Sequence, residues 1–191
     1  TRISRRWDWL GPFPAGEHEQ AVDVFFPSLW GDDLSSNFPS RNKSKYISEY
    51  VPGGFVSWQQ HMADSSGVLS IQYQGLGRNT FFGWALGEME VLADTCLILQ
   101  AVGTVWSAFV EGASLSGPGR DAGLRKISDL PHGALLYLSR GSHKLLVKVK
   151  STSSSASFQL RSSPCGERAG KLEVVKLLPG NWQVGHGRWS Q

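Results

Sequence analysis

The sequence predicts an all-β protein, specifically an antiparallel β-sandwich of about ten strands with little helix. Gly and Trp are both frequent, at 22 and 8 of 191 residues, which is typical of short strands joined by tight turns. Hydrophobic residues make up 40% and charged residues 18% of the chain, the balance of a folded globular domain. The third observation is a series of β-forming runs with alternating polarity, each bounded by turn residues.

The alternation is clearest in the run V-L-S-I-Q-Y-Q at residues 68–74. Leu69, Ile71 and Tyr73 share one side of this run and polar residues occupy the other, which predicts a half-buried antiparallel strand. Residues 80–93 contain good helix formers. However, Gly83 and Gly87 would each cost a helix about 1 kcal/mol, so a strand is favoured here too.

The stretch from Asp94 to Lys150 predicts two antiparallel hairpins. The first is expected to turn near Gly103 and the second at residues 140–143, where turn residues interrupt two β-forming runs. Lys144, Lys148 and Lys150 fall on one side of the last strand, and we expect that side to be solvated.

The first fourteen residues predict a strand that ends at Gly11, because two prolines follow. Trp7 and Trp9 lie two residues apart and therefore share one side of this strand. They either cap an edge of the core or form a platform on which a sugar ring stacks, since Trp offers a flat apolar face.

The domain organisation follows from composition. Residues 1–165 are expected to form the sandwich, with an irregular insertion at about 15–53 that is rich in Gly, Pro, Ser and Asp. Residues 166–191 predict one more strand and a Gly/Trp tail that links to a further domain. Asp32 and Asp33 in the insertion are the only candidate Ca²⁺ ligands, and they lack the spacing of a calcium loop, so no cofactor is expected.

Cys96 and Cys165 allow one internal disulfide. The favoured interpretation is that Cys96, which lies in mid-strand beside Leu97 and Leu99, is a buried free thiol, and the disulfide to Cys165 is the alternative. Asn42 begins an Asn-Lys-Ser glycosylation sequon. Together with a first residue that is not Met, the sequon favours a secreted protein, of which this chain would be a mature or excised part.

No motif for catalysis is found. The chain has no Gly-x-Ser-x-Gly, and Ser142 and His143 are neighbours in extended backbone, where adjacent side chains point apart. Glu88 and Glu90 could pair as glycosidase carboxylates, but solvent-facing strand positions explain them better. The five histidines have no metal-ligand spacing. We therefore expect a non-enzyme.

Two partner classes are also not expected. The first hundred residues carry 7 Lys/Arg and 11 Asp/Glu and the remainder carry 12 and 5, but no basic run with interleaved aromatics indicates nucleic-acid binding. No apolar run approaches the roughly 20 residues of a membrane helix.

Short segments of the chain resemble galactose-binding-like jelly-roll modules. The similar segments are Leu97–Leu99, Phe109–Gly112, Leu136–Leu138 and Gly141–Val149. This resemblance implies a jelly-roll accessory domain.

A narrower resemblance is to the N-terminal β-rich region of secreted prolyl-oligopeptidase-like α/β-hydrolases. It rests on the segments Arg6–Gly16, Ser48–Trp58, Gly83–Ala85 and Leu138–Leu145. The resemblance implies that catalytic residues belong to a separate hydrolase domain.

The predicted function is a non-catalytic extracellular accessory or interaction domain attached to a hydrolase. The alternative is a carbohydrate-binding module that uses exposed Trp residues, Trp58 among them. The candidate ligand-binding residues from both readings are Trp7, Trp9, Trp30, Trp106, Glu111 and Arg120. The loop at 113–133 and the tail containing Trp182 and Trp189 are the candidate docking surfaces.

Overall fold

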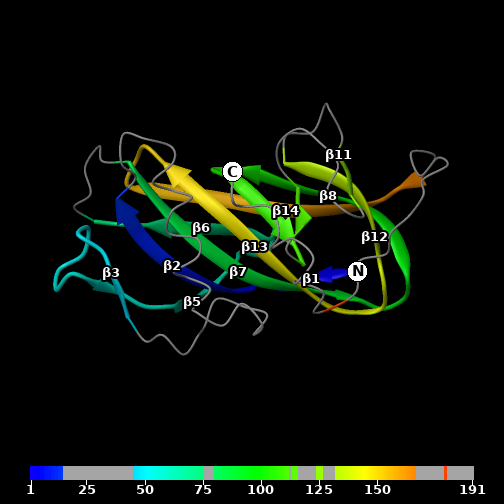
Figure 1. The fold of residues 1–191 in the computed structure, drawn as a ribbon, viewed down its shortest axis with the longest axis horizontal. Helices are drawn as coiled ribbons and strands as arrows, with labels where there is room; N and C mark the ends of the chain where they lie inside the picture. The colour runs from blue at the N-terminus through cyan, green and yellow to red at the C-terminus, as the bar shows by residue number, and fades with distance from the viewer. Residues whose placement is uncertain are drawn as a thin grey trace, which may run out of the picture.

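A computed structural model describes residues 1–14, 45–74, 80–111, 113–115, 124–126, 132–166 and 179. Every regular element named among these residues is a β-strand, which confirms the all-β prediction (Figure 1). The fourteen strands are β1 (Arg2–Ile3), β2 (Arg6–Pro14), β3 (Tyr46–Ile47), β4 (Phe55–Val56), β5 (Gln59–Met62), β6 (Val68–Gln72), β7 (Phe81–Val91), β8 (Thr95–Gly103), β9 (Ser107–Val110), β10 (Ala113–Ser114), β11 (Leu124–Lys126), β12 (Gly133–Leu138), β13 (Gly141–Ser151) and β14 (Ser155–Pro164).

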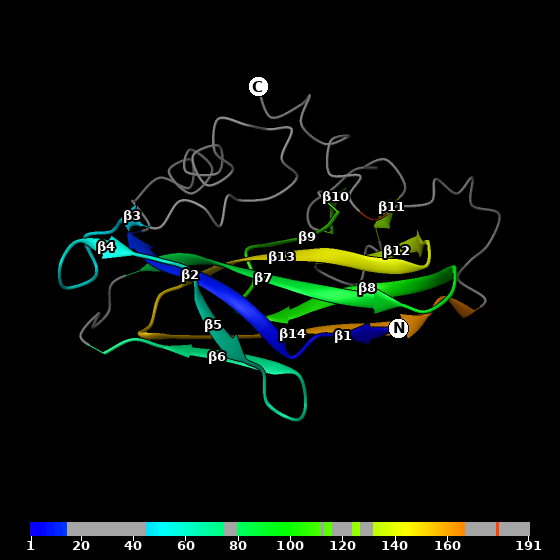
Figure 2. The same ribbon diagram turned by 90° about the horizontal axis from the view of Figure 1, so that it is seen from below.

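The strands form two packed antiparallel sheets, the sandwich that the sequence predicted. The larger sheet has the order β10-β9-β13-β7-β2-β5, and β1 pairs with β7 outside this path. The smaller sheet has the order β11-β12-β8-β14-β6, and β3 and β4 form a separate pair. In Figure 2 the strands β13, β7 and β2 of the larger sheet lie above β14 and β6 of the smaller one.

The two predicted hairpins are wrong, because the chain changes sheet at both turns. β8 pairs with β12 and β14 in the smaller sheet, whereas β9 pairs with β13 in the larger one, so the turn at Gly103 is an arch. The turn at 140–143 likewise joins β12 of the smaller sheet to β13 of the larger. A hairpin and an arch bury the same alternating side chains, so polarity alone cannot distinguish them.

The main core lies between the two sheets and includes Leu69 and Ile71, as predicted, with Tyr73 packed against it. On its inner face, β7 carries the small residues Gly83, Ala85 and Gly87, which alternate with larger side chains on the outer face. These small residues leave room in the core for two indole rings. Trp7 and Trp9 fill that room and are only 2% and 1% exposed.

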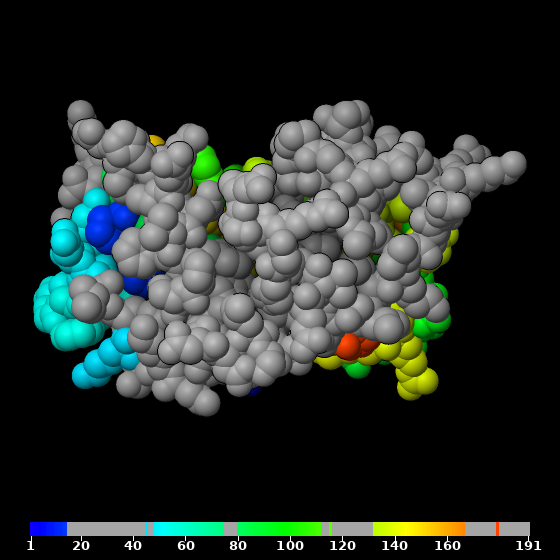
Figure 3. Space-filling model, viewed as in Figure 1, coloured from blue at the N-terminus to red at the C-terminus, as the bar shows by residue number. Residues whose placement is uncertain are grey.

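A second apolar cluster lies on the outer face of the larger sheet. Its buried members are Leu10, Phe13, Val56, Phe82, Trp84, Leu86, Phe109 and Leu146. Val51, Val56 and Trp58 come from the segment before β5, whose atoms lie beside those of β2 at one end of this face (cyan and blue, Figure 3). The larger sheet therefore carries buried apolar side chains on both faces.

This cluster corrects the expectation that the lysines of β13 are all solvated. Lys148 is 2% exposed, and its Nζ lies 4.7 Å from the ring centroid of Trp84. Lys150 is half-buried, with Nζ 4.5 Å from the ring of Trp106. Both ammonium groups lie over aromatic faces, an arrangement that stabilises a cation away from bulk water.

The first long strand continues beyond Gly11, contrary to prediction. The register of β2 against β7 shifts between Leu10 and Phe13, so a bulge contains Gly11 and Pro12, which do not fit a regular ladder. Pairing resumes at Phe13 and Pro14.

Replacing Gly87 with alanine is expected to lower the free energy of unfolding by roughly 3 kcal/mol, at the upper end of overpacking effects. A Cβ at this position would lie 2.6 Å from Cζ3 and 2.7 Å from Cε3 of Trp7, well inside van der Waals contact. Trp7 cannot easily retreat, because its ring packs edge-on against Phe158 at a centroid distance of 5.2 Å. Urea denaturation of both proteins measures the loss.

A double-mutant cycle with Trp7→Phe tests this cause. The smaller ring removes the atoms that the new methyl group meets, so Gly87→Ala should cost much less in the Trp7→Phe background. Equal costs in the two backgrounds would show that the penalty does not come from the Trp7 contact.

Candidate binding site on the outer face of the larger sheet

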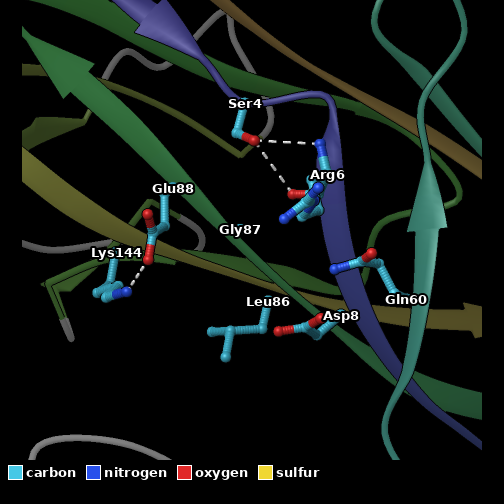
Figure 4. Close-up of a pocket in the computed structure, with 8 residues that line it drawn as sticks. All are labelled: Ser4, Arg6, Asp8, Gln60, Leu86, Gly87, Glu88 and Lys144. Atoms are coloured by element: carbon cyan, nitrogen blue, oxygen red, sulfur yellow. Dashed lines mark hydrogen bonds and ion pairs between the residues drawn. The ribbon is translucent and has the colours of Figure 1, made fainter.

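The outer face of the larger sheet carries a polar depression of about 210 Å³ next to the apolar cluster. Side chains from four adjacent strands and the β1–β2 connection meet there (Figure 4). The lining residues are Ser4, Arg6, Asp8, Gln60, Leu86, Gly87, Glu88 and Lys144. Leu86 also belongs to the apolar cluster, so it marks the boundary between the two halves of this face.

A local mismatch between strands produces the hollow. Ile3 pairs with Met89, and Asp8 is the next residue to pair, with Leu86. Between these two pairs the segment from β1 to β2 advances five residues, whereas β7 advances three. The two additional residues of the first segment bulge out of the sheet. Ser4 fixes this bend, because its Oγ accepts a hydrogen bond from the backbone N–H of Arg6 at 3.1 Å.

Charges alternate across the strands at this level. Glu88 of β7 is opposite Lys144 of β13 in the register, and their side chains form a partly exposed ion pair. On the other side of Glu88 lies Arg6, an exposed residue whose guanidinium group has no hydrogen-bond or salt-bridge partner in the described part of the chain. The exposed side-chain amide of Gln60 is also without a hydrogen-bond partner. Donors are thus available on rigid strands, as recognition of a polar group requires.

The nearest histidine does not reach into this depression. His61 follows Gln60 in β5, and so its ring points to the opposite face, toward Trp7, its partner in the register. Burial lowers the pKa of His61, which keeps the imidazole neutral at pH 7. The residues that line the depression therefore do not include a histidine.

Glu111, a predicted ligand-binding residue, is instead buried in the structure. It is 4% exposed, and its Oε1 accepts a hydrogen bond from the backbone N–H of Lys144 at 2.8 Å. The same oxygen lies 3.3 Å from Nδ1 of His143. Glu111 has a φ of 47°, in the left-handed region that costs a non-glycine residue about 1 kcal/mol or more. The carboxylate therefore joins the end of β9 to β13 and is not presented to a ligand.

His143 completes this buried group. Its ring is 0% exposed, and Nε2 lies 2.8 Å from the carbonyl oxygen of Ser139. A carbonyl only accepts, so Nε2 carries a proton and donates. Ser142 is exposed on the opposite side of the strand, so the side chains of Ser142 and His143 point apart.

The sugar-platform interpretation of Trp7 and Trp9 is wrong, because both rings lie in the core between the sheets. The indole N–H of Trp9 donates to the hydroxyl of Tyr73. Burial raises the pKa of Tyr73 far above its usual range, so the phenol stays protonated as this hydrogen bond's acceptor. Trp106 is half-buried beneath Lys150, and Trp58 is half-buried as well.

Among the described residues, the exposed large hydrophobic side chains are Phe55, Met62 and Leu92. The remaining predicted positions lie outside the described residues. These are Trp30, Asp32, Asp33, Asn42, Arg120, Trp182, Trp189 and the strand expected after residue 166.

Cys96 and Cys165 form a disulfide, with their Cα atoms 5.5 Å apart. The favoured interpretation of Cys96 as a free buried thiol is therefore wrong. The bond lies where β8 and β14 run side by side, next to the register pair Leu97–Pro164. Neighbouring strands place the two Cβ atoms within bonding range, a proximity that 69 residues of intervening sequence do not reveal.

The sequence analysis missed Arg6, Asp8 and Gln60 as a site. Arg6 and Asp8 share the strand side opposite Trp7 and Trp9, and this parity was the available signal. Gln60 joins them through the pairing of β5 with β2, and Glu88 through β7. Both pairings span more than fifty residues and are set by tertiary structure.

Comparison with known proteins gives no assignment, since neither a family model nor a curated protein sequence matches this chain. Within the described ranges, no three His, Cys, Asp or Glu side chains gather in a way that could hold a metal ion. In the same ranges, no helix has the length and hydropathy needed to cross a membrane.

Proposed function

We propose that this chain is a non-catalytic accessory or interaction domain of an extracellular protein, attached to a hydrolase. The observation that carries the proposal is the polar depression on the outer face of the larger sheet, whose side-chain donors Arg6 and Gln60 have no hydrogen-bond partners among the residues that the structure describes. Preformed polar groups on rigid strands favour recognition of a partner over chemistry.

One further feature supports the proposal. The Cys96–Cys165 disulfide fits an oxidising compartment, in keeping with the Asn42 sequon.

The test combines an activity screen with an interaction screen on the purified chain. We expect no turnover of ester, peptide or glycoside substrates. We also expect the natural reading frame to encode an α/β-hydrolase domain, and that domain, expressed separately, to bind this chain. Turnover that co-purifies with the chain would contradict the proposal, as would a hydrolase domain that fails to bind.

Carbohydrate binding is the second candidate function. Arg, Asp, Gln and Glu side chains line the depression, and these planar polar groups can hydrogen-bond to sugar hydroxyls. The described part of the chain offers no exposed Trp platform, so binding would depend on hydrogen bonds. A glycan array distinguishes this candidate, and binding of neutral glycans that is lost in Gln60→Ala would support it.

A further inference from the structure

We infer that the depression recognises a carboxylate group, held by the guanidinium of Arg6 with help from the amide of Gln60. The inference rests on the proposed binding function and specifies the chemistry of the partner. It would make the partner an acidic one, presenting either a sugar acid or an Asp or Glu side chain.

Charge balance within the depression is the first argument. Lys144 and Glu88 neutralise each other in an ion pair, and Asp8 also has an interaction within the chain. Arg6 is left as the charged group without a partner. The protein as a whole has a formal net charge of +3, which favours approach of an anion.

Geometry is the second argument. A guanidinium presents its N–H groups as a planar fork that matches the two oxygens of a carboxylate. Arg6 and Gln60 lie on adjacent paired strands, and in Figure 4 both side chains point into the same hollow. The amide of Gln60 can donate to the same group, which gives the ligand a third hydrogen bond.

Size and the position of Asp8 limit what can bind. About 210 Å³ is below the volume of pockets that enclose drug-sized ligands, so the hollow accepts one side chain or one sugar ring. Asp8 lies two residues from Arg6 on the same side of β2 and is the register partner of Gln60, so it limits the room for an anion between these two donors.

The experiment titrates the chain with four probes and follows backbone amide shifts by NMR. D-glucuronate and a blocked Gly-Glu-Gly peptide represent the two sources of a carboxylate. D-glucose is the neutral match for glucuronate, and sulfate is a tetrahedral anion. We expect at least one carboxylate probe to shift residues around Arg6 and to bind at least about tenfold more tightly than glucose or sulfate.

The source is identified by which carboxylate probe binds more tightly. Arg6→Gln should weaken that binding at least about tenfold, and Arg6→Lys should also weaken it, because an ammonium lacks the fork. Gln60→Ala should weaken it less. The matched controls are Arg161→Gln and Gln72→Ala, exposed residues of the smaller sheet, and these should leave the affinity unchanged.

Several results would overturn the inference. They are equal affinity for glucose and glucuronate, tighter binding of sulfate, full affinity in Arg6→Lys, or no shift near Arg6 at roughly 50 mM carboxylate, far above a millimolar Kd. Binding of glucose that is lost in Gln60→Ala would refute the carboxylate while leaving a binding function in place. Turnover of a substrate would instead refute the proposed function.

Discussion

Replacing Glu111 with alanine is expected to lower the free energy of unfolding by roughly 3 kcal/mol, the upper end of the cost of leaving a buried polar group without its partner. The substitution removes the acceptor of the Lys144 backbone N–H and leaves Nδ1 of His143 facing an apolar interior. Both partners are almost completely buried, so water cannot replace the lost contacts. Urea denaturation followed by Trp fluorescence measures the change.

Two control variants separate the causes. Glu88→Ala breaks an ion pair that is 34% and 49% exposed, and it should cost less than about 1 kcal/mol. Glu111→Gly removes the same side chain but relaxes the backbone at φ 47°, so it should be about 1 kcal/mol less damaging than Glu111→Ala. A cost for Glu111→Ala as small as that of Glu88→Ala would show that the buried pair contributes little.

Removing the disulfide with the double substitution of Cys96 and Cys165 by alanine is expected to cost roughly 4 kcal/mol, the chain-entropy value for a loop of this length. The bond joins residues 69 apart and encloses most of β8 and all of β9 to β14, which belong to both sheets. Its absence therefore allows the unfolded chain many more conformations. Thermal unfolding of the two proteins gives the difference.

Reduction provides the independent check. Dithiothreitol should lower the Tm of the natural sequence by about as much as the double substitution does, and it should leave the variant unchanged. A variant as stable as the oxidised protein would mean that the paired strands β8 and β14 alone hold this region in place, with no contribution from the covalent link.

The local strand structure of this protein could be predicted well. Alternation identified β6 with Leu69 and Ile71 inward, and two glycines favoured a strand over a helix at β7. The short strand expected at Leu124 is β11. These features depend on neighbours in sequence, and local polarity and backbone preference are sufficient to determine them.

The candidate site could be predicted only in part. The side of β2 that holds Arg6 and Asp8 follows from the parity of Trp7 and Trp9. The depression itself forms because the segment between β1 and β2 bulges opposite β7 and because β5 places Gln60 beside β2. Both features depend on strand pairing. The burial of Glu111 and Lys148 could not be predicted either. The sequence does not show whether a charged side chain faces water or is covered by another part of the chain.

The sequence by itself determined that this chain forms an antiparallel β-sandwich, because period-two polarity and turn residues act over a few neighbouring positions. Tertiary structure alone decided which strands share a sheet, that Gly103 and residues 140–143 are arches, and that Cys96 bonds to Cys165. It also placed Arg6 and Gln60, without partners of their own, at one hollow. Strand pairing, the disulfide and the depression depend on contacts between residues far apart in the chain. The energies of these contacts cannot be inferred from a local sequence pattern.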